Sequence, residues 1–190
     1  IYPIKSLDGI AVQQATVLES GALMGDREFA IVDCQGKFVN GKRHPAIHSL
    51  RSQFDVAHRT ITVWQQGSPE AASFQLDCDR IPFEEWLSNF FGFPVKLIKN
   101  MEMGFPDDTD SPGATIISTE TLQTLSTWFP DLDLDQLRRR FRSNFEISGG
   151  GAFWEDRLYR EMGNFVPFQV GEVAFLGVNP CQRCIVPTRD

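Results

Sequence analysis

The chain has 190 residues, of which 42% are hydrophobic and 23% charged, a composition typical of a folded globular protein. Its formal charge of -7 argues against general binding to nucleic acid or to an acidic membrane surface. No apolar run approaches the roughly 20 residues that cross a bilayer, and no signal peptide is visible, so we expect a cytoplasmic protein. Because the chain begins at Ile1 and stops at Asp190 without a closing element, we expect it to be part of a longer protein.

Short extended segments are predicted in the first half of the chain, where β-branched and aromatic residues alternate with turn-forming residues. These predicted strands are residues 1–4, 14–18, 29–33, 53–58, 61–65 and 73–76. A hairpin turn is expected at residues 33–37, because Gly36 can adopt the positive φ that such turns need. This spacing favours a barrel or rolled sheet over alternating βαβ units.

Helical patterns dominate the later part of the chain. Pro82 opens a segment whose apolar residues recur with helical spacing until Gly92. Ser118 is a predicted N-cap for a second helix, and a third helix is expected at residues 135–142. Further strands are predicted at residues 144–147 and 173–178. The fold class is therefore predicted to be mixed and β-rich, of the α+β type.

The four cysteines are too few for a disulfide framework, so we expect reduced thiols. Cys34 and Cys78 lie in or beside apolar runs and are predicted to be small core residues. Cys181 and Cys184 are three positions apart, and Arg183 precedes the second. A thiolate binds soft or high-valent metals, and a neighbouring guanidinium favours the thiolate and can hold a phosphate.

Two other chemistries for the terminal thiol pair stay open at this stage. The pair could be half of a zinc site, but no second Cys-x-x-Cys exists, and Pro45 opposes a helical pairing of His44 with His48. A redox dithiol like that of thioredoxin is disfavoured, because Pro187 follows too soon for a helix to begin at the pair.

Two cationic side chains near the N-terminus are candidates for holding an anion. Lys5 and Ser6 end the first predicted strand, where an ammonium and a hydroxyl could grip a phosphate, although most such pairs are simply solvated. Arg27 enters another strand, and its alternative role is an ion pair with Asp26 or Glu28.

Four motifs occur in one order along the chain, namely residues 2–6 with Gly9, residues 25–29, residues 141–144 and residues 179–184. Together they resemble the MOSC proteins, named for the C-terminal domain of molybdenum cofactor sulfurase. Within that family, they are similar to the branch with an N-terminal barrel domain, which includes the mitochondrial amidoxime-reducing component. The resemblance covers essentially the whole chain.

The resemblance implies an N-terminal β-barrel-like domain at residues 1–98. It also implies a MOSC β-barrel with a few helices at residues 99–190, incomplete at its C-terminus. Strands near residues 1–30 are implied to line the cofactor site as well.

The resemblance also implies a cofactor, the molybdenum–molybdopterin complex (Moco), and its binding residues. Cys184 is implied to be both the metal ligand and the catalytic residue. The residues implied to hold the pterin and its phosphate are Lys5, Ser6, Arg27, Ser111, Arg142, Asn144, Gln182 and Arg183. A multiply charged phosphate needs several converging cations, and arginine offers bidentate geometry.

The implied activity is that of a molybdenum-dependent oxidoreductase that reduces small N-hydroxylated substrates such as amidoximes, or N-oxides and S-oxides. No cysteine cluster here could hold an iron–sulfur centre, so electrons are expected from a separate iron–sulfur, flavin or haem partner. The alternative is a module that binds or carries Moco or sulfur without its own turnover. Neither a nucleic-acid nor a membrane partner is expected, nor is binding of pyridoxal phosphate.

Overall fold

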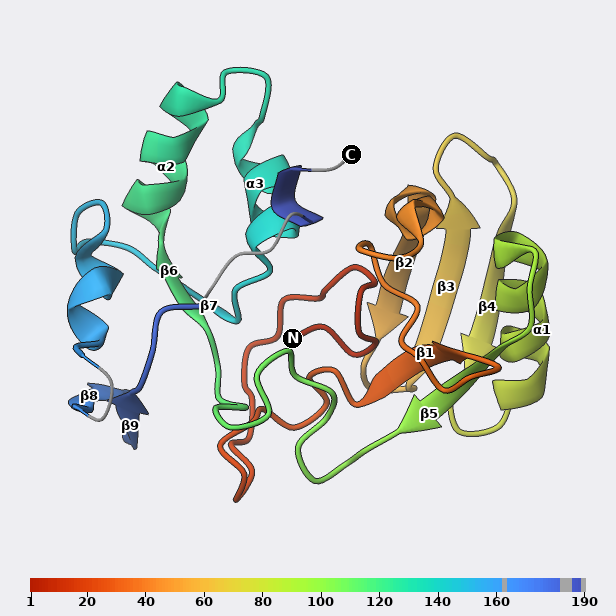
Figure 1. Ribbon diagram of the computed structural model, residues 1–190, viewed down its shortest axis with the longest axis horizontal. Coiled ribbons are helices and arrows are strands. Elements are labelled where there is room, and N and C mark those ends of the chain that lie inside the picture. The colour runs from red at the N-terminus through yellow and green to blue at the C-terminus, as the bar shows by residue number, and fades with distance from the viewer. Residues whose placement is uncertain (162–163, 182–185, 189–190) are drawn as a thin grey trace. The chain divides into compact units, whose positions relative to one another are not determined.

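The computed structural model describes residues 1–161, 164–181 and 186–188 (Figure 1). The described chain divides into two compact units, which we call unit 1 (Ile1–Gly113, with Thr188) and unit 2 (the described residues of Ala114–Pro187). The domain boundary expected at residue 98 stays a prediction, because compactness alone does not define a domain that folds independently. Among the described helices, none is long and apolar enough to cross a membrane.

Unit 1 contains two antiparallel sheets. The first pairs β1 (Phe29–Asp33) with β5 (Val95–Lys99), and the second is a meander of β2 (Leu50–Asp55), β3 (Thr60–Gln65) and β4 (Ala71–Gln75). Buried and more exposed positions alternate along β2 and β3, as expected for a sheet with one face on the core.

No ladder among the described residues joins these two sheets into the closed barrel that was expected. The predicted strand at residues 1–4 contributes a single bridge, between Ile4 and Phe29, and the one at 14–18 contributes only the bridge from Val17 to Leu23. The first segment cannot continue as a strand, because Ser6 takes a φ of 74° and turns the chain. The coarser prediction of a mixed fold with strands and a few helices is confirmed.

Helix α1 (Arg80–Phe91) covers the core of unit 1 with the fully buried side chains of Phe83 and Leu87. The helix begins two residues before Pro82, which lies in the first turn, where its missing N–H leaves no helical hydrogen bond unmade. Gly92 ends it with a φ of 76°, as the sequence predicted. The short 3-10 helix η1 (Pro45–Ser49) buries Ile47 in the same core.

Unit 2 has a small core of Ile117, Leu122, Leu125 and Leu137. Its elements are β6 (Ile116–Ser118), α2 (Thr119–Trp128), α3 (Leu134–Phe141), β7 (Phe145–Ile147), the 3-10 helix η2 (Trp154–Leu158), β8 (Val166–Val170) and β9 (Val173–Gly177), and the 3-10 segment η3 covers Val186–Thr188. β6 and β7 pair in parallel, and β8 and β9 form a hairpin. The predicted N-cap is confirmed, because Ser118 Oγ accepts a 3.0 Å hydrogen bond from Thr121 N.

The prediction that Cys34 and Cys78 are core residues was wrong. Both thiols are exposed, Cys34 in the turn that follows β1 and Cys78 in the turn that precedes α1. Turn residues lie at the surface because their backbone polar groups need water or local partners. Cys181 is exposed as well.

Candidate functional site

The opening segment runs beside the residues that enter β1, which brings two predicted cofactor residues onto adjacent backbone. Arg27 N donates to Tyr2 O at 2.7 Å, and Phe29 N donates to Pro3 O at 3.0 Å. Lys5 N then donates back to Phe29 O at 2.8 Å. Unit 1 therefore holds Lys5 and Arg27 on two paired segments that are more than 20 residues apart in sequence.

The Lys5 ammonium contacts the loop at residues 105–107, and the sequence analysis did not predict this contact. Its Nζ donates to Phe105 O at 2.9 Å and to Pro106 O at 3.3 Å, and lies 2.6 Å from Asp107 Oδ1. The Lys5 side chain is 10% exposed, whereas the Asp107 side chain is 89% exposed. The ring of Phe38, 5.4 Å from Nζ to the centroid, lies near the same ammonium.

Arg27 is paired within its own segment. Its Nη1 contacts Asp26 Oδ2, and the other carboxylate oxygen of Asp26 accepts a 2.7 Å hydrogen bond from Tyr2 N. The guanidinium also lies 5.6 Å from the Tyr2 ring centroid. The ion pair considered as an alternative role for Arg27 is present, so a bound anion would share the guanidinium with Asp26.

Gly104 anchors the loop that carries the acceptors of Lys5. Its φ is 66°, and a Cβ there would lie only 2.5 Å from Asp26 O, so a larger residue does not fit. Phe105 N donates to Arg27 O at 2.9 Å. Residues 104–107 are thus fixed to the Arg27 segment at one end and to the Lys5 side chain at the other. The glycine before an acidic run was the only sequence signal of this role.

In unit 2, the Asn144 side chain, just before β7, accepts hydrogen bonds from Thr115. Its Oδ1 accepts from Thr115 N at 3.1 Å and from Thr115 Oγ1 at 3.2 Å. Asn144 Nδ2 and the neighbouring Ser143 Oγ are buried without a hydrogen-bond partner among the described residues. Native proteins rarely leave such atoms unpaired, so these two have the capacity to pair with water or with a ligand.

The predicted site residues fall into three groups. Lys5, Ser6, Arg27 and Ser111 lie in unit 1, and Ser111 N donates to Asp108 Oδ1 at 3.1 Å in the loop after residue 104. Arg142 and Asn144 lie in unit 2. Gln182, Arg183 and Cys184 lie outside the described residues, and their roles stay predictions.

Left-handed backbone marks three of these predicted residues. Among the residues that the structure describes, five non-glycine residues have a positive φ, namely Ser6 (74°), Arg27 (50°), Arg59 (51°), Arg142 (55°) and Phe153 (61°). This conformation costs roughly 1 kcal/mol or more for a residue with a Cβ and tends to persist at functional sites. Ser6, Arg27 and Arg142 are also cofactor residues that the sequence resemblance predicts.

The zinc alternative for the terminal thiol pair stays untested, because Cys184 lies outside the described residues. No group of three or more His, Cys, Asp or Glu side chains among them could hold a metal ion. The ring of His44 instead packs against Phe93, with 4.9 Å between the ring centroids.

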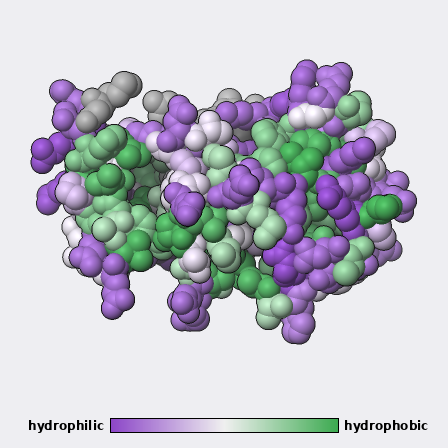
Figure 2. All heavy atoms as spheres, turned by 90° about the horizontal axis from the view of Figure 1, so that it is seen from below, coloured by the Kyte–Doolittle hydropathy of each residue, from purple (hydrophilic) through white to green (hydrophobic). Residues whose placement is uncertain are grey.

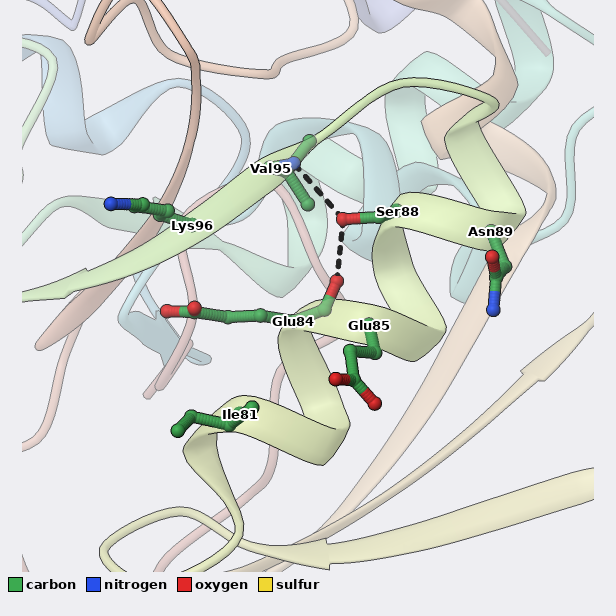
Figure 3. A pocket seen from close by; sticks show the side chains of 7 residues that line it. All are labelled: Ile81, Glu84, Glu85, Ser88, Asn89, Val95 and Lys96. Atoms are coloured by element: carbon green, nitrogen blue, oxygen red, sulfur yellow. Dashed lines mark hydrogen bonds between the residues drawn. The ribbon is translucent and has the colours of Figure 1, made fainter.

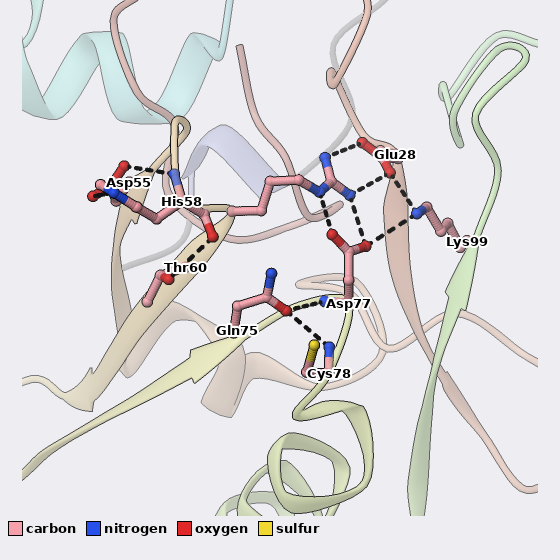
Figure 4. Close-up of polar contacts among 9 residues, drawn as sticks. Glu28, Asp55, His58, Thr60, Gln75, Asp77, Cys78 and Lys99 are labelled. Carbon is pink, nitrogen blue, oxygen red and sulfur yellow. Dashed lines mark hydrogen bonds and ion pairs between the residues drawn. The ribbon is translucent and has the colours of Figure 1, made fainter.

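A four-residue ion-pair network links the two sheets of unit 1 (Figure 4). Arg59, in the turn between β2 and β3, binds Glu28 and Asp77, and Lys99 of β5 lies 3.3 Å from Glu28 Oε1 and 3.2 Å from Asp77 Oδ1. Hydrogen bonding to Glu28 and then to Asp77 raises the pKa of Arg59, and the bond from Arg59 lowers the pKa of Asp77. These pKa shifts arise from a structural network. Glu28, which follows Arg27 in sequence, pairs with Arg59 and Lys99 in this network.

A shallow groove of about 420 Å³ lies between α1 and β5 (Figure 3). It is lined by Ile81, Glu84, Glu85, Ser88, Asn89, Val95 and Lys96, none of which is a predicted site residue. Val95 N donates to Ser88 Oγ at 3.0 Å, and Leu97 N donates to Glu84 Oε1 at 2.8 Å. Side chains of α1 therefore occupy the backbone donors on the open edge of β5, as a neighbouring strand would.

Exposed apolar side chains do not indicate a second site. Apolar and polar residues are interspersed on the face drawn in Figure 2. In unit 2, Trp128 is 59% exposed and stacks on Phe153 with 5.6 Å between the centroids. Scattered apolar residues of this kind are normal on protein surfaces.

Comparison with known proteins identifies the relatives of the chain. Residues 1–86 match the family described as MOSC N-terminal beta barrel domain. The chain is 23% identical to molybdenum cofactor sulfurase of Homo sapiens and 25% identical to that of Bos taurus, and each match covers 97% of this chain but 25% of the relative. It is 25% identical to mitochondrial amidoxime-reducing component 1 of Mus musculus, over 100% of this chain and 64% of the relative.

No solved structure matches the chain significantly. The chain spans about a quarter of the length of the sulfurases it matches and under two thirds of the amidoxime-reducing component. Residues 1–86 thus match the MOSC N-terminal beta barrel domain, and over nearly its whole length the chain is a distant homologue of molybdenum cofactor sulfurase and of the mitochondrial amidoxime-reducing component.

Proposed function

We propose that this protein binds Moco and uses it to reduce N-hydroxylated compounds such as amidoximes, or related N- and S-oxides. The observation that carries the proposal is the left-handed backbone at Ser6, Arg27 and Arg142. Sequence motifs predict these three residues, and they are three of the five non-glycine residues with a positive φ in the described part of the chain. The names of the relatives, which include an amidoxime-reducing component, agree with this chemistry.

The described residues fit the proposed cofactor in chemical type. Lys5 and Arg27 supply two cations on paired segments of unit 1, as a phosphate requires. In unit 2, Ser143 Oγ and Asn144 Nδ2 are buried polar atoms for which a pterin or phosphate would be a suitable partner. Bound molybdenum would supply two-electron redox chemistry, while the protein supplies position and electrostatic field.

The proposed reaction takes an amidoxime to an amidine. The N–O bond breaks, two electrons and two protons enter, and the oxygen leaves as water. The electrons would come from a separate iron–sulfur, flavin or haem protein. Cys184 is the proposed thiolate ligand, and Arg183 beside it would favour the thiolate.

The second candidate is a module that holds or transfers Moco or sulfur without turning over a substrate. It is favoured by the sulfurase relatives, of which the chain matches only about a quarter. Substrate turnover separates the two candidates.

The test is reduction of benzamidoxime by protein that was produced in a host that makes Moco and then chemically reduced. We expect benzamidine to form, and Cys184→Ala to abolish its formation. Cys181→Ala, which removes the neighbouring exposed thiol, is the matched control and should retain most activity. Moco-loaded protein that forms no benzamidine would favour the carrier, and unchanged turnover by Cys184→Ala would reject the ligand assignment.

A further inference from the structure

Among the described residues, the Lys5 ammonium has acceptors of two kinds. Phe105 O and Pro106 O are neutral backbone carbonyls in a loop that is fixed to Arg27 by a backbone hydrogen bond. Asp107 Oδ1, at 2.6 Å, is the charged acceptor and belongs to a side chain that is 89% exposed. The ammonium thus has a fixed neutral side and a charged side that faces solvent.

This asymmetry makes the Asp107 contact the easier one to exchange. A carboxylate that is mostly in water loses little when it leaves an ion pair, because water solvates it again. The two carbonyls would continue to hold the Lys5 side chain in place. The ammonium therefore stays positioned for another anion after Asp107 has moved away.

The neighbouring acidic residues of the loop differ from Asp107. Asp108 Oδ1 accepts from Asp110 N at 3.0 Å and from Ser111 N at 3.1 Å, which ties its carboxylate into the turn. Asp110 is exposed and takes part in that turn through its backbone N–H. Of the three carboxylates, Asp107 is the one in contact with the Lys5 ammonium.

We propose that Asp107 is a displaceable internal anion, which a phosphate group replaces on the ammonium of Lys5. The inference rests on the proposed function only in taking Lys5 as a phosphate-binding residue. Asp107 then competes with incoming anions, so an anion binds Lys5 only if it interacts with the ammonium more strongly than the Asp107 carboxylate does. A multiply charged phosphate forms stronger charge-assisted hydrogen bonds than a carboxylate and displaces it, whereas acetate offers no such advantage.

The experiment is isothermal titration of the purified protein with inorganic phosphate, and with acetate as a monoanionic probe. We expect Asp107→Asn to tighten phosphate binding about fivefold, the upper range for an ion pair with one exposed partner, and to allow measurable acetate binding. Asp110→Asn removes the same charge from the same loop and should change phosphate affinity less than about twofold, because the exposed Asp110 carboxylate forms no ion pair with the Lys5 ammonium and is screened by salt. Lys5→Gln should abolish phosphate binding.

Two results would overturn the proposal. One is an equal effect of Asp107→Asn and Asp110→Asn, and the other is the absence of a phosphate response in both the wild type and Asp107→Asn. If Lys5→Gln does not fold, the comparison of the two aspartate variants still decides. If phosphate replaces Asp107 on Lys5 but the protein never retains molybdenum, only the proposed function is contradicted. If the protein retains molybdenum but phosphate does not replace Asp107, only this inference is contradicted.

Discussion

Arg59 and Glu28 join the two sheets of unit 1 through two parallel hydrogen bonds, 2.8 Å from Nη2 to Oε1 and 3.2 Å from Nη1 to Oε2. Glu28 directly precedes β1, and its side chain is only 8% exposed. Among the described residues no ladder connects β1 with the meander, so this ion pair connects two sheets that backbone hydrogen bonds do not join.

Removing Arg59 should therefore destabilise unit 1. We expect Arg59→Ala to lower the free energy of unfolding by about 2 kcal/mol, less than for a fully buried pair because Arg59 is 37% exposed and Lys99 still faces Glu28. Urea unfolding of the two proteins measures the difference. Arg43→Ala, which breaks an ion pair with Asp33 from a 40% exposed arginine, should cost less than about 1 kcal/mol. Equal losses would contradict a linking role for Arg59.

The same network should make stability depend on pH. The hydrogen bond from Arg59 lowers the pKa of Asp77 below its ordinary 3.8, so the carboxylate stabilises the fold above that value. This contribution is lost as the pH falls below 3.8 towards the folded-state value. The difference in unfolding free energy between the wild type and Asp77→Asn should thus be largest at neutral pH and shrink in acid.

Chemical unfolding at neutral pH and at about pH 2.5 would measure this difference. Glu70→Gln is the control, because Glu70 forms no ion pair with any described residue. A difference between the wild type and Asp77→Asn that is the same at both pH values would contradict the network's role.

Much of the local structure could be predicted from the sequence, and the errors have physical causes. β1, α1 and the N-cap Ser118 follow from apolar spacing and capping chemistry, and the structure confirms them. β5 was missed because the expected domain boundary after residue 98 was placed within it, although Val95 and Leu97 alternate with more exposed positions as in a strand. β2 begins at Leu50, three residues before its predicted start, because the preceding 3-10 helix leads directly into it.

Glu84 should protect the open edge of β5. Replacing it by Ala leaves the Leu97 N–H without its acceptor and should cost about 1 to 2 kcal/mol. The freed edge should also promote self-association. Glu85→Ala is a matched control, since the Glu85 side chain lines the groove from the next position, whereas the backbone donor of Leu97 is bonded by Glu84. Sedimentation velocity and urea unfolding measure both effects, and identical behaviour of the two variants would refute the capping role.

Backbone strain at Arg142 gives a prediction that separates stability from binding. Arg142 ends α3 with a φ of 55°, a conformation that glycine adopts without penalty. We expect Arg142→Gly to be about 1 kcal/mol more stable than Arg142→Ala, while both lose cofactor. Thermal unfolding and molybdenum analysis provide the two readouts. Full molybdenum content in either variant would remove Arg142 from the proposed site.

The candidate site was only partly accessible to sequence reasoning. Motifs selected Lys5 and Arg27, because residue type and local order suffice to recognise them. The contacts of Lys5 with Phe105, Pro106 and Asp107 span about 100 positions, and no local pattern encodes such a pairing. The left-handed φ at Ser6 was equally invisible, since a serine carries no sign of it.

We propose that this chain holds molybdenum through Cys184. The most direct measurement is the molar ratio of molybdenum to protein, by inductively coupled plasma mass spectrometry, for the wild type, Cys184→Ala and Cys181→Ala produced in a host that makes Moco. We predict substantial molybdenum in the wild type and in Cys181→Ala, and a loss of most of it in Cys184→Ala. Wild-type protein without molybdenum, or a Cys184→Ala variant that retains it fully, would contradict the account.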